Sequence, residues 1–425
     1  MRVDTAEQAL DLIEDNDTIW CHSMAATPYF LLQALAKFAL NRRNLTLLQL
    51  HTEHSEMLCK PELAGHLRQR CFFVGRTTRA AVNCGQADYV PIFLSEIPKL
   101  MRSSEQIVDV ALIQVSLPDQ HGFCSLGISV EATRAALQMA KKVIAWVNPQ
   151  MPRTHGDSFV HISQIDRYVE YSAALPLHLA AEQNDVTQQI GKHIASLIRD
   201  GDCLQLGIGA IPDATLGYLS DRKHLGIHTE MFSDGILPLV EQGVITNQNK
   251  RKHRGKIVTT FAMGSQKLYD FVNDNPQVVF LDVEYTNDTS VIRQNPQVVS
   301  INSALQIDLS GQVCADSLGT QIYSGVGGQM DFVRGAALSD GGRSVIALPA
   351  TANGGKVSRI SSLLSPGAGV VTTRAHVHYV VTEFGIADLK AKSLSERAKA
   401  LINITAPQFR AQLAEQAWQD WRLKL

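Results

Sequence analysis

Residues 203–214 read Cys203-Leu-Gln-Leu-Gly-Ile-Gly-Ala-Ile-Pro-Asp-Ala214, which is a short apolar run followed by a glycine-rich turn. The apolar run predicts a strand, and the residues after the turn predict a helix that begins near Asp213. A strand that passes through a tight turn directly into a helix is the repeating unit of α/β folds. This stretch therefore predicts the fold class.

The same alternation of short apolar runs and helical patterns extends along the whole chain. It indicates largely parallel sheets with helices on both faces. The predicted strands are Leu45–Leu50, Cys71–Val74, Val108–Val115, Val143–Val147, Cys203–Leu206, Lys256–Phe261, Val278–Val283, Val298–Ile301, Ser344–Leu348 and Tyr379–Thr382. The predicted helices are Tyr29–Leu40, Val130–Lys142, Thr187–Arg199 and Ile236–Gln242, and Ser393-Leu-Ser-Glu396 reads as a capping box that opens a last helix.

The length of 425 residues exceeds the size at which a single core stops growing, so two domains are expected. A polar stretch around Gln183–Asp185 is the natural boundary. We therefore predict two tandem open α/β domains, at residues 1–185 and 186–425. Ligands of such sheets bind beyond the carboxyl ends of the strands.

Charge and cysteine usage exclude several classes of protein. Lys and Arg number 39 against 41 Asp and Glu, for a net charge of -2, so the basic surface of a nucleic-acid-binding protein is not expected. No apolar run of about 18 residues predicts a membrane span. Seven scattered cysteines without CxxC spacing argue against a disulfide framework and favour a reducing cytoplasm.

Glu230 is the residue most suggestive of chemistry. It ends the strand-like run Leu225–Glu230, which lies in sequence between the glycine-rich turns Gly207–Ala214 and Gly325–Phe332. Glycines let backbone N–H groups approach a ligand, and a carboxylate beside such donors can act as a nucleophile whose oxyanion they stabilise. This arrangement suggests acyl chemistry, although a lone Glu at a strand end is more often solvated or paired with a cation.

The glycine-rich segments allow other interpretations. The first turn lacks the third glycine of a dinucleotide fingerprint and has Pro212 in its place, which disfavours a nicotinamide site. Asp331 could cap a helix after the second turn. A third loop, Asn353-Gly-Gly-Lys356, could meet a phosphate through Lys356, but such a lysine is more often a solvated surface charge.

Metal and serine chemistry have weaker support. His51 and His54 form no HExxH motif, and neither do His376 and His378, for which buried or hydrogen-bonded roles are expected. The chain has no GxSxG motif, the local signature of many serine hydrolases. No metal site is predicted.

Six segments are informative by their order and spacing, namely Asp119–Gly127, Asn148–Pro152, Gly207–Ala214, His228–Gly235, Gly325–Phe332 and Thr382–Ala387. Together they resemble the acetyl-CoA hydrolase/transferase family, and within it the 4-hydroxybutyrate CoA-transferases. The resemblance covers almost the whole chain.

The resemblance implies two α/β domains of the CoA-transferase type with an active site between them, and Glu230 as the nucleophile. It implies a ping-pong reaction through a glutamyl-CoA thioester, with coenzyme A as cosubstrate and no metal. The expected substrates are acyl-CoA and short carboxylic acids such as 4-hydroxybutyrate, butyrate and acetate. A cytoplasmic homodimer is expected.

The resemblance also implies further site residues. Backbone amides of Ile208 and Gly328 are expected to stabilise the oxyanion, and Ser23–Pro28 is a candidate for the acid pocket. The expected coenzyme A contacts are Gly207, Gly209, Gly325, Gly327, Gly328, Asn353, Gly354 and Lys356.

Three alternatives stay open on sequence alone. Water could intercept the intermediate and make the protein an acyl-CoA hydrolase. The fold could bind coenzyme A or another metabolite without catalysis, or serve a nicotinamide oxidoreductase. Rates measured with and without an acceptor acid test for the hydrolase. Full biological activity of a Glu230→Ala variant would indicate the non-catalytic binding protein, and a change in NAD(P)H absorbance would indicate the oxidoreductase.

Overall fold

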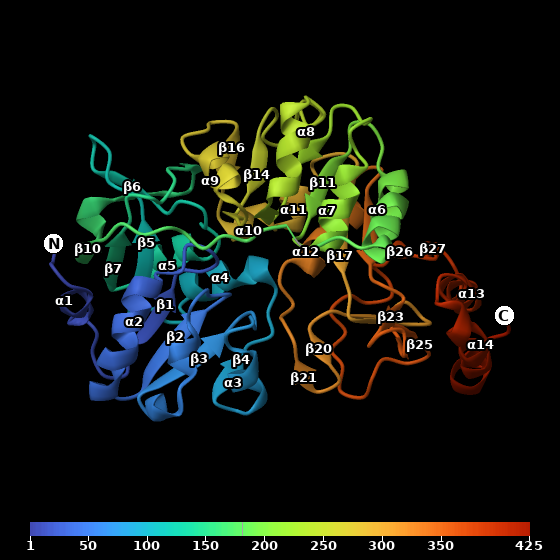
Figure 1. Ribbon diagram of the computed structural model, residues 1–425, viewed down its shortest axis with the longest axis horizontal. Helices are drawn as coiled ribbons and strands as arrows, with labels where there is room; N and C mark the ends of the chain where they lie inside the picture. The colour runs from blue at the N-terminus through green and yellow to red at the C-terminus, as the bar shows by residue number, and fades with distance from the viewer. Residues whose placement is uncertain (181) are drawn as a thin grey trace. The chain divides into compact units, whose positions relative to one another are not determined.

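The computed structural model describes residues 1–180 and 182–425, which fold as two compact units (Figure 1). Each unit is assembled from separate stretches of the chain. Unit 1 comprises residues 1–179, 258–286 and 322–327, and unit 2 comprises the described residues of 180–257, 287–321 and 328–425. The predicted domain limits at 185 and 186 stay a prediction.

Unit 1 is built on a seven-stranded sheet in which every neighbouring pair of strands is parallel. The strand order is β10-β7-β5-β1-β2-β3-β4. Their bounds are β1 Thr18–Cys21, β2 Leu45–Gln49, β3 Leu67–Cys71, β4 Ala87–Tyr89, β5 Val110–Val115, β7 Lys142–Val147 and β10 Arg167–Glu170.

Helices cover both faces of this sheet, because successive strand residues point to opposite sides. Ile19 and Leu47 pack in one core cluster with α1 (Ala6–Leu10) and α2 (Tyr29–Phe38). Trp20 and Leu48, one residue further along each strand, pack in a second cluster with α4 (Ile97–Arg102) and α5 (Thr133–Met139). Both faces are therefore buried, as parallel sheets require.

Unit 2 contains a six-stranded sheet of order β12-β11-β17-β22-β26-β27, which is parallel except for the last pair. The strands are β11 Cys203–Leu206, β12 Gly226–Ile227, β17 Val298–Ser303, β22 Arg343–Ala347, β26 Tyr379–Thr382 and β27 Gly385–Asp388. The main helices are α6 Asp185–Leu197, α7 Ala210–Gly217, α12 Gln329–Leu338, α13 Leu394–Asn403 and α14 Pro407–Trp421.

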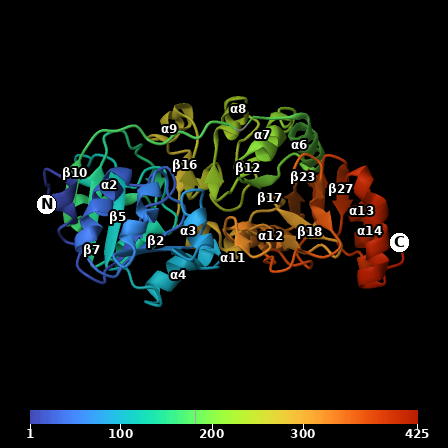
Figure 2. The ribbon, with the colours of Figure 1, turned by 60° about the horizontal axis from the view of Figure 1, so that its bottom comes forward.

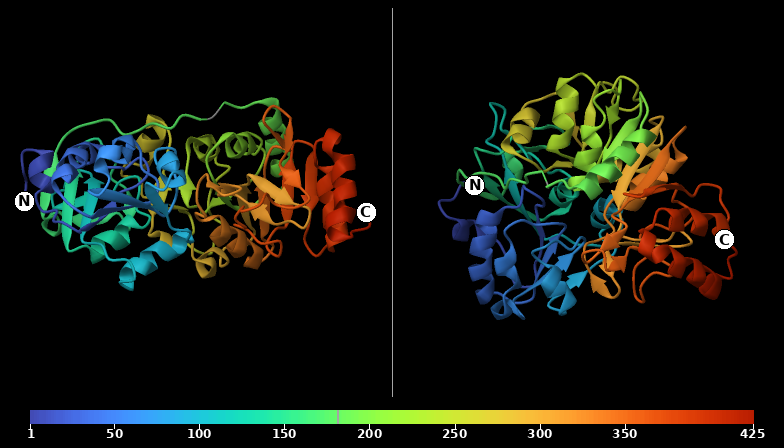
Figure 3. Two further views of the ribbon diagram at one scale, coloured as in Figure 1. Left: turned by 90° about the horizontal axis from the view of Figure 1, so that it is seen from below. Right: turned by 45° about the vertical axis from the view of Figure 1, so that its right-hand side comes forward.

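The last two helices lie side by side, as the red end of the chain shows in Figures 2 and 3. Helix α13 begins with the predicted capping box, in which the Ser393 hydroxyl accepts from Glu396 N and the Glu396 carboxylate accepts from Ser393 N. Apolar residues of both helices pack against Ile346 and Val380 of the sheet. The predicted α/β class with largely parallel sheets is confirmed.

Several predicted boundaries are wrong, each for a local reason. Cys71–Val74 was predicted as a strand, but β3 ends at Cys71, because its pairing with β2 uses the preceding residues 67–71. The predicted helix Val130–Lys142 shortens to α5, since residue 130 still hydrogen-bonds Thr260 and β7 starts at Lys142. The central strand β1 was not predicted, because its four residues are too few to show a period.

Within residues 1–180 and 182–425, no helix combines the length and apolar character needed to cross a membrane.

Candidate active site

Glu230 lies just beyond β12, at the carboxyl end of the unit 2 sheet (Figure 2 labels β12). The preceding residue fixes it to the neighbouring strand β11. The Thr229 hydroxyl accepts from Leu206 N at 3.3 Å and donates to Leu206 O at 3.0 Å. Leu206 is the residue directly before Gly207, so Glu230 follows a segment anchored beside the first glycine turn.

The Glu230 carboxylate is held by a fully buried asparagine. Asn287 Nδ2 donates to Glu230 Oε2 at 2.8 Å and to Asp331 Oδ2 at 3.3 Å. Asn287 lies just before helix α11 (Thr289–Ile292), whose N-cap is Asp288. One amide thus bridges two carboxylates from distant parts of the sequence.

This environment raises the pKa of Glu230 to about 7, from an ordinary value near 4.5. Burial makes the largest contribution, because it disfavours the charged form. The nearby Asp331 charge raises the pKa further, whereas the hydrogen bond from Asn287 lowers it. The residue as a whole is half-buried, so part of Glu230 lies at the protein surface.

Gly328 lies against the same carboxylate. A Cβ placed on Gly328 would overlap both Glu230 Oε2 and Asn287 Nδ2. Its φ of -94° is accessible to any residue, so the position is restricted by space rather than by conformation. Gly328 is also the N-cap of the ten-residue helix α12, and the free N–H groups of a helix start favour negative charge.

The first glycine turn is shaped by its last glycine. Gly209 has φ +119° and ψ 176°, a conformation that is essentially restricted to glycine, and α7 starts at the next residue. The predicted helix start near Asp213 is therefore three residues late, and Pro212 lies inside the first helical turn. Space is open around the Cα atoms of Gly207 and Gly209, and Ile208 is 53 % exposed.

The second glycine turn is divided between the two units. Gly325 and Gly327 belong to unit 1, whereas Gly328 begins α12 in unit 2. A Cβ on Gly325 would lie 2.9 Å from Phe73 Cδ2, and Gly327, with φ +57°, accepts from Leu94 N at 3.0 Å. Packing within unit 1 therefore accounts for both glycines, and their predicted contact with coenzyme A stays a prediction.

The third loop is the turn of a hairpin between β23 (Thr351–Ala352) and β24 (Val357–Ser358). Asn353, Gly354 and Gly355 all have positive φ, at 51°, 65° and 86°. Lys356 is exposed beside them. Gly355 N donates to Ala352 O at 3.1 Å, which closes the turn, and the predicted contact of this loop with coenzyme A stays a prediction.

Two family models match this chain. They are described as the acetyl-CoA hydrolase/transferase N-terminal domain, over residues 1–176, and the acetyl-CoA hydrolase/transferase C-terminal domain, over residues 264–417. A 4-hydroxybutyrate coenzyme A transferase from Clostridium kluyveri is 51% identical over 96% of this chain and 95% of its own. The chain belongs to the acetyl-CoA hydrolase/transferase family. The predicted enzyme class, a CoA-transferase, is confirmed as well.

Two further proteins support this assignment. A succinyl-CoA:acetate/propanoyl-CoA:succinate CoA transferase from Fasciola hepatica is 46% identical over 99% of this chain and 88% of its own. The crystal structure of RipA from Yersinia pestis matches with a TM-score of 0.93 and 37% identity, over 99% of this chain and 97% of that chain.

Two residues that lie near Glu230 were missed by sequence reasoning. Asn287 was not singled out in the sequence, and Asp331 was considered only as a possible helix cap. The N-cap of α12 is Gly328, and Asp331 lies buried inside the first turn, where it accepts from Asn287. No local pattern marks either residue, because both reach Glu230 through the tertiary fold.

The Thr382–Ala387 motif of the transferase has a structural contribution. Glu383 Oε2 accepts from Ala350 N at 2.8 Å, which ties the turn after β26 to the chain that leads into the Asn353–Lys356 hairpin. In unit 1, Ser23 of the predicted acid pocket is fully buried and donates to Glu131, so its hydroxyl serves the core.

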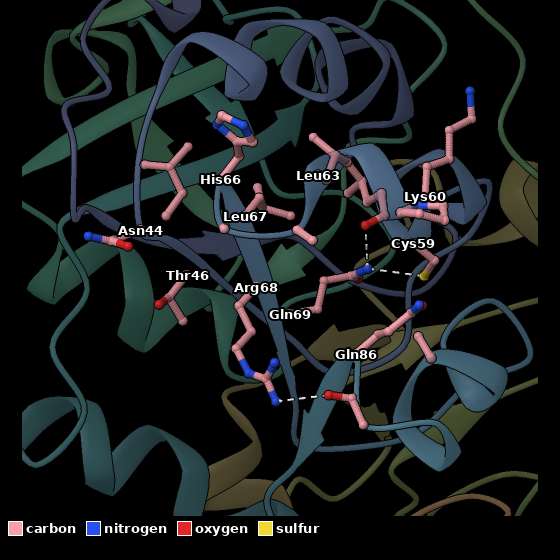
Figure 4. A pocket seen from close by; sticks show the side chains of 17 residues that line it. Asn44, Thr46, Cys59, Lys60, Leu63, His66, Leu67, Arg68, Gln69 and Gln86 are labelled. Atoms are coloured by element: carbon pink, nitrogen blue, oxygen red, sulfur yellow. Dashed lines mark hydrogen bonds between the residues drawn. The ribbon is translucent and has the colours of Figure 1, made fainter.

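One cavity of the transferase lies away from Glu230, in unit 1. It has a volume of about 610 Å³ and includes none of the predicted site residues. Figure 4 shows Gln69 at its wall, donating to Leu58 O at 3.0 Å and Cys59 Sγ at 3.1 Å. Within the described ranges 1–180 and 182–425, no group of three or more His, Cys, Asp or Glu side chains is arranged to hold a metal ion.

Proposed function

We propose that this transferase exchanges coenzyme A between a short-chain acyl-CoA and a free carboxylic acid, with Glu230 as its nucleophile. The observation that carries the proposal is the Glu230 carboxylate itself. Its pKa is raised to about 7 by burial, and it lies against both the Asn287 amide and Gly328 at the start of α12. The names of the relatives support a transfer reaction with acids of this size.

The raised pKa of Glu230 suits an attack on a thioester. Nucleophilicity rises with basicity, and an ordinary carboxylate is a much weaker base than the thiolate it must displace, since an alkyl thiol such as Cys has a pKa of about 8.5. A carboxylate of pKa about 7 is closer in basicity to the thiolate. The first step is therefore less uphill than it would be for an exposed glutamate.

The proposed reaction has two half-reactions. The Glu230 carboxylate attacks the acyl-CoA carbonyl, and the C–S bond breaks to give an acyl-glutamyl anhydride and coenzyme A thiolate. The thiolate attacks the glutamyl carbonyl, which releases the first acid and leaves a glutamyl-CoA thioester. An incoming carboxylate attacks this thioester, and the returning thiolate then takes the new acyl group and regenerates Glu230.

Each attack creates a tetrahedral oxyanion that needs hydrogen-bond donors. We assign this role to the backbone amides of Ile208 and Gly328, and one such donor contributes on the order of 3 kcal/mol. Asn287 Nδ2 holds the nucleophile in place before the attack. Distant contacts to the coenzyme from Asn353, Gly354 and Lys356 would supply binding energy that is used at the reacting carbon.

The acids we propose are 4-hydroxybutyrate, butyrate and acetate. The test is a steady-state assay with butyryl-CoA as donor and acetate or 4-hydroxybutyrate as acceptor. The proposal predicts parallel double-reciprocal plots, as ping-pong transfer requires, and little release of coenzyme A without acceptor. Rapid release without acceptor would instead make the protein a hydrolase. No turnover with any short acyl-CoA would contradict the proposed substrate class.

A further inference from the structure

The strand that leads to Glu230 is closed on its outer edge by two side chains. Strand β12 is the edge strand of the unit 2 sheet and pairs on its inner side with β11. On the outer side, Ile227 N donates to Asn247 Oδ1 at 2.8 Å, and Ile227 O accepts from Lys250 Nζ at 2.7 Å. Ile227 and Asn247 are fully buried, and Lys250 is 3% exposed.

The loop that carries Lys250 is itself fixed. Lys250 Nζ also donates to Lys256 O at 2.7 Å, and Gly255 N donates to Asn247 O at 3.0 Å. The buried Asn295 accepts from Arg251 N and Lys252 N at 3.1 and 2.9 Å. The ammonium group therefore has one defined position, from which it fixes the backbone of β12.

A buried lysine is a costly way to close a strand edge, because the ammonium loses its hydration. Burial lowers the pKa of Lys250 to about 8, and the titratable group that acts on it is the buried Cys203 thiol of β11. Two charge-assisted hydrogen bonds to carbonyl oxygens offset part of this cost. The use of a buried lysine here indicates that the backbone of β12 must be placed precisely.

We propose that Lys250 is a positioning residue that sets the place of the Glu230 carboxylate beside Gly328 and Asn287. The inference rests on the proposed role of Glu230 as nucleophile. Ile227 precedes Glu230 by three residues, and Thr229 fixes the intervening chain to β11 on the inner side. The segment is thus held from both edges, and a reacting group must be held within about 0.5 Å of its productive geometry.

The test is a Lys250→Met variant of the full chain, which keeps the length of the side chain but has no donor. We expect kcat to fall by about 10²-fold, because small misplacements of a reacting group have effects of that size. KM for butyryl-CoA should stay within about threefold, since no substrate contact is removed. The rate of butyryl-CoA-dependent borohydride inactivation should fall in parallel with kcat.

Lys142→Met is the matched control. Lys142 Nζ donates to the backbone carbonyl of Leu12 at 2.8 Å and also pairs with the carboxylates of Glu14 and Asp17, but this lysine lies in unit 1 and β7. Its loss should lower the melting temperature without the selective loss of kcat. The inference would be overturned if Lys250→Met had the same kcat as wild type. It would also be overturned if Lys142→Met, at an equal loss of stability, showed the same fall in kcat as Lys250→Met.

Lys250→Gln keeps the inference testable if Lys250→Met does not fold, because the amide retains N–H donors. Its terminal nitrogen is one bond closer to the backbone than Lys250 Nζ and cannot hold both carbonyls in place, so kcat should still fall by about tenfold at unchanged KM, and a wild-type kcat would overturn the inference. Failure of the proposed function can be distinguished from failure of this inference. If the proposed function is wrong, wild-type protein itself shows no modification at Glu230 after treatment with butyryl-CoA and borohydride, and the Lys250 variants do not change that result.

Discussion

Glu131 in unit 1 and Glu230 in unit 2 are both surrounded by protein, yet their surroundings are opposite. Glu131 is fully buried and accepts from the hydroxyls of Ser23, Ser129 and Thr133, and from Thr133 N at 2.6 Å. Glu230 is partly exposed, lies against Gly328 and shares the Asn287 amide with a second carboxylate.

The difference separates a structural carboxylate from a reactive one. Four donors converge on the Glu131 carboxylate, and its complete burial leaves no room for a ligand. At Glu230 the neighbouring Asp331 charge opposes ionisation, and a glycine takes the place of a side chain. Glu131 thus stabilises the fold, whereas the ionised form of Glu230 is unfavourable in its surroundings, as is common at functional sites.

The largest expected effect comes from Glu230→Gln. This variant retains the shape of the side chain but lacks the nucleophile, so kcat should fall by about 10⁴-fold or more. The measurement is transfer from butyryl-CoA to acetate, with circular dichroism to show that the variant is folded. Retention of more than about a tenth of the wild-type kcat would exclude covalent catalysis by Glu230.

Glu131→Gln sharpens the same comparison. Its amide N–H₂ cannot accept the hydrogen bonds that the carboxylate accepts, so the free energy of unfolding should fall by about 3 kcal/mol. Urea denaturation measures this change. The folded variant should keep most of its kcat, and a selective loss of kcat without destabilisation would show that Glu131 is not a structural residue.

Gly328→Ala should have the next largest effect. The added methyl group would overlap Glu230 Oε2 and Asn287 Nδ2, so the carboxylate must move, and kcat should fall by about 10²-fold. Gly217→Ala is the matched control, because nothing lies within 4 Å of its added methyl group in α7. The control should keep its kcat, and equal kcat values for the two variants would remove Gly328 from the site.

Two substitutions should shift the acid limb of the pH profile of kcat/KM in opposite directions. The limb should lie near pH 7 in wild type, where Glu230 loses its proton. Asp331→Asn removes a charge that raises this pKa, so the limb moves to lower pH. Asn287→Ala removes a hydrogen bond that lowers the pKa, so the limb moves to higher pH. Shifts in the same direction would contradict the assignment of the limb to Glu230.

The smallest expected effect is on stability. Between pH values of about 4.5 and 7 the folded protein retains a proton on Glu230 that the unfolded chain releases, so stability falls as pH rises through this range. Gln does not ionise. The gain in unfolding free energy of Glu230→Gln over wild type should therefore be larger at about pH 8.5 than at about pH 5. Urea titrations at the two pH values test this, and an equal gain at both would contradict a raised pKa.

The class of the fold could be predicted because strand and helix periods are local properties. The run Cys203–Leu206 and the turn after it were sufficient for that purpose, and β11 has the predicted bounds. Strand β1 was missed because its four residues are too few to show a period, and β3 was displaced because its bounds follow from pairing with β2.

The candidate site was partly predictable, because some of its features are visible in short stretches of sequence. Glu230 and the glycine turns stand out in the sequence, since a glycine cluster is rare without a backbone requirement. Asn287, Asp331 and Lys250 do not stand out, because each acts through a hydrogen bond between segments that are far apart in the sequence. A polar residue of this type has no signature until the fold brings its partner close.

The most direct test of the account is to trap the intermediate. Wild-type protein would be incubated with butyryl-CoA without acceptor acid, treated with borohydride, and digested for mass analysis of every peptide. The account predicts reduction of the Glu230 side chain to an alcohol, dependent on butyryl-CoA and absent in Glu230→Gln. Turnover of butyryl-CoA with an unmodified Glu230 peptide, or a modification at another residue, would contradict it.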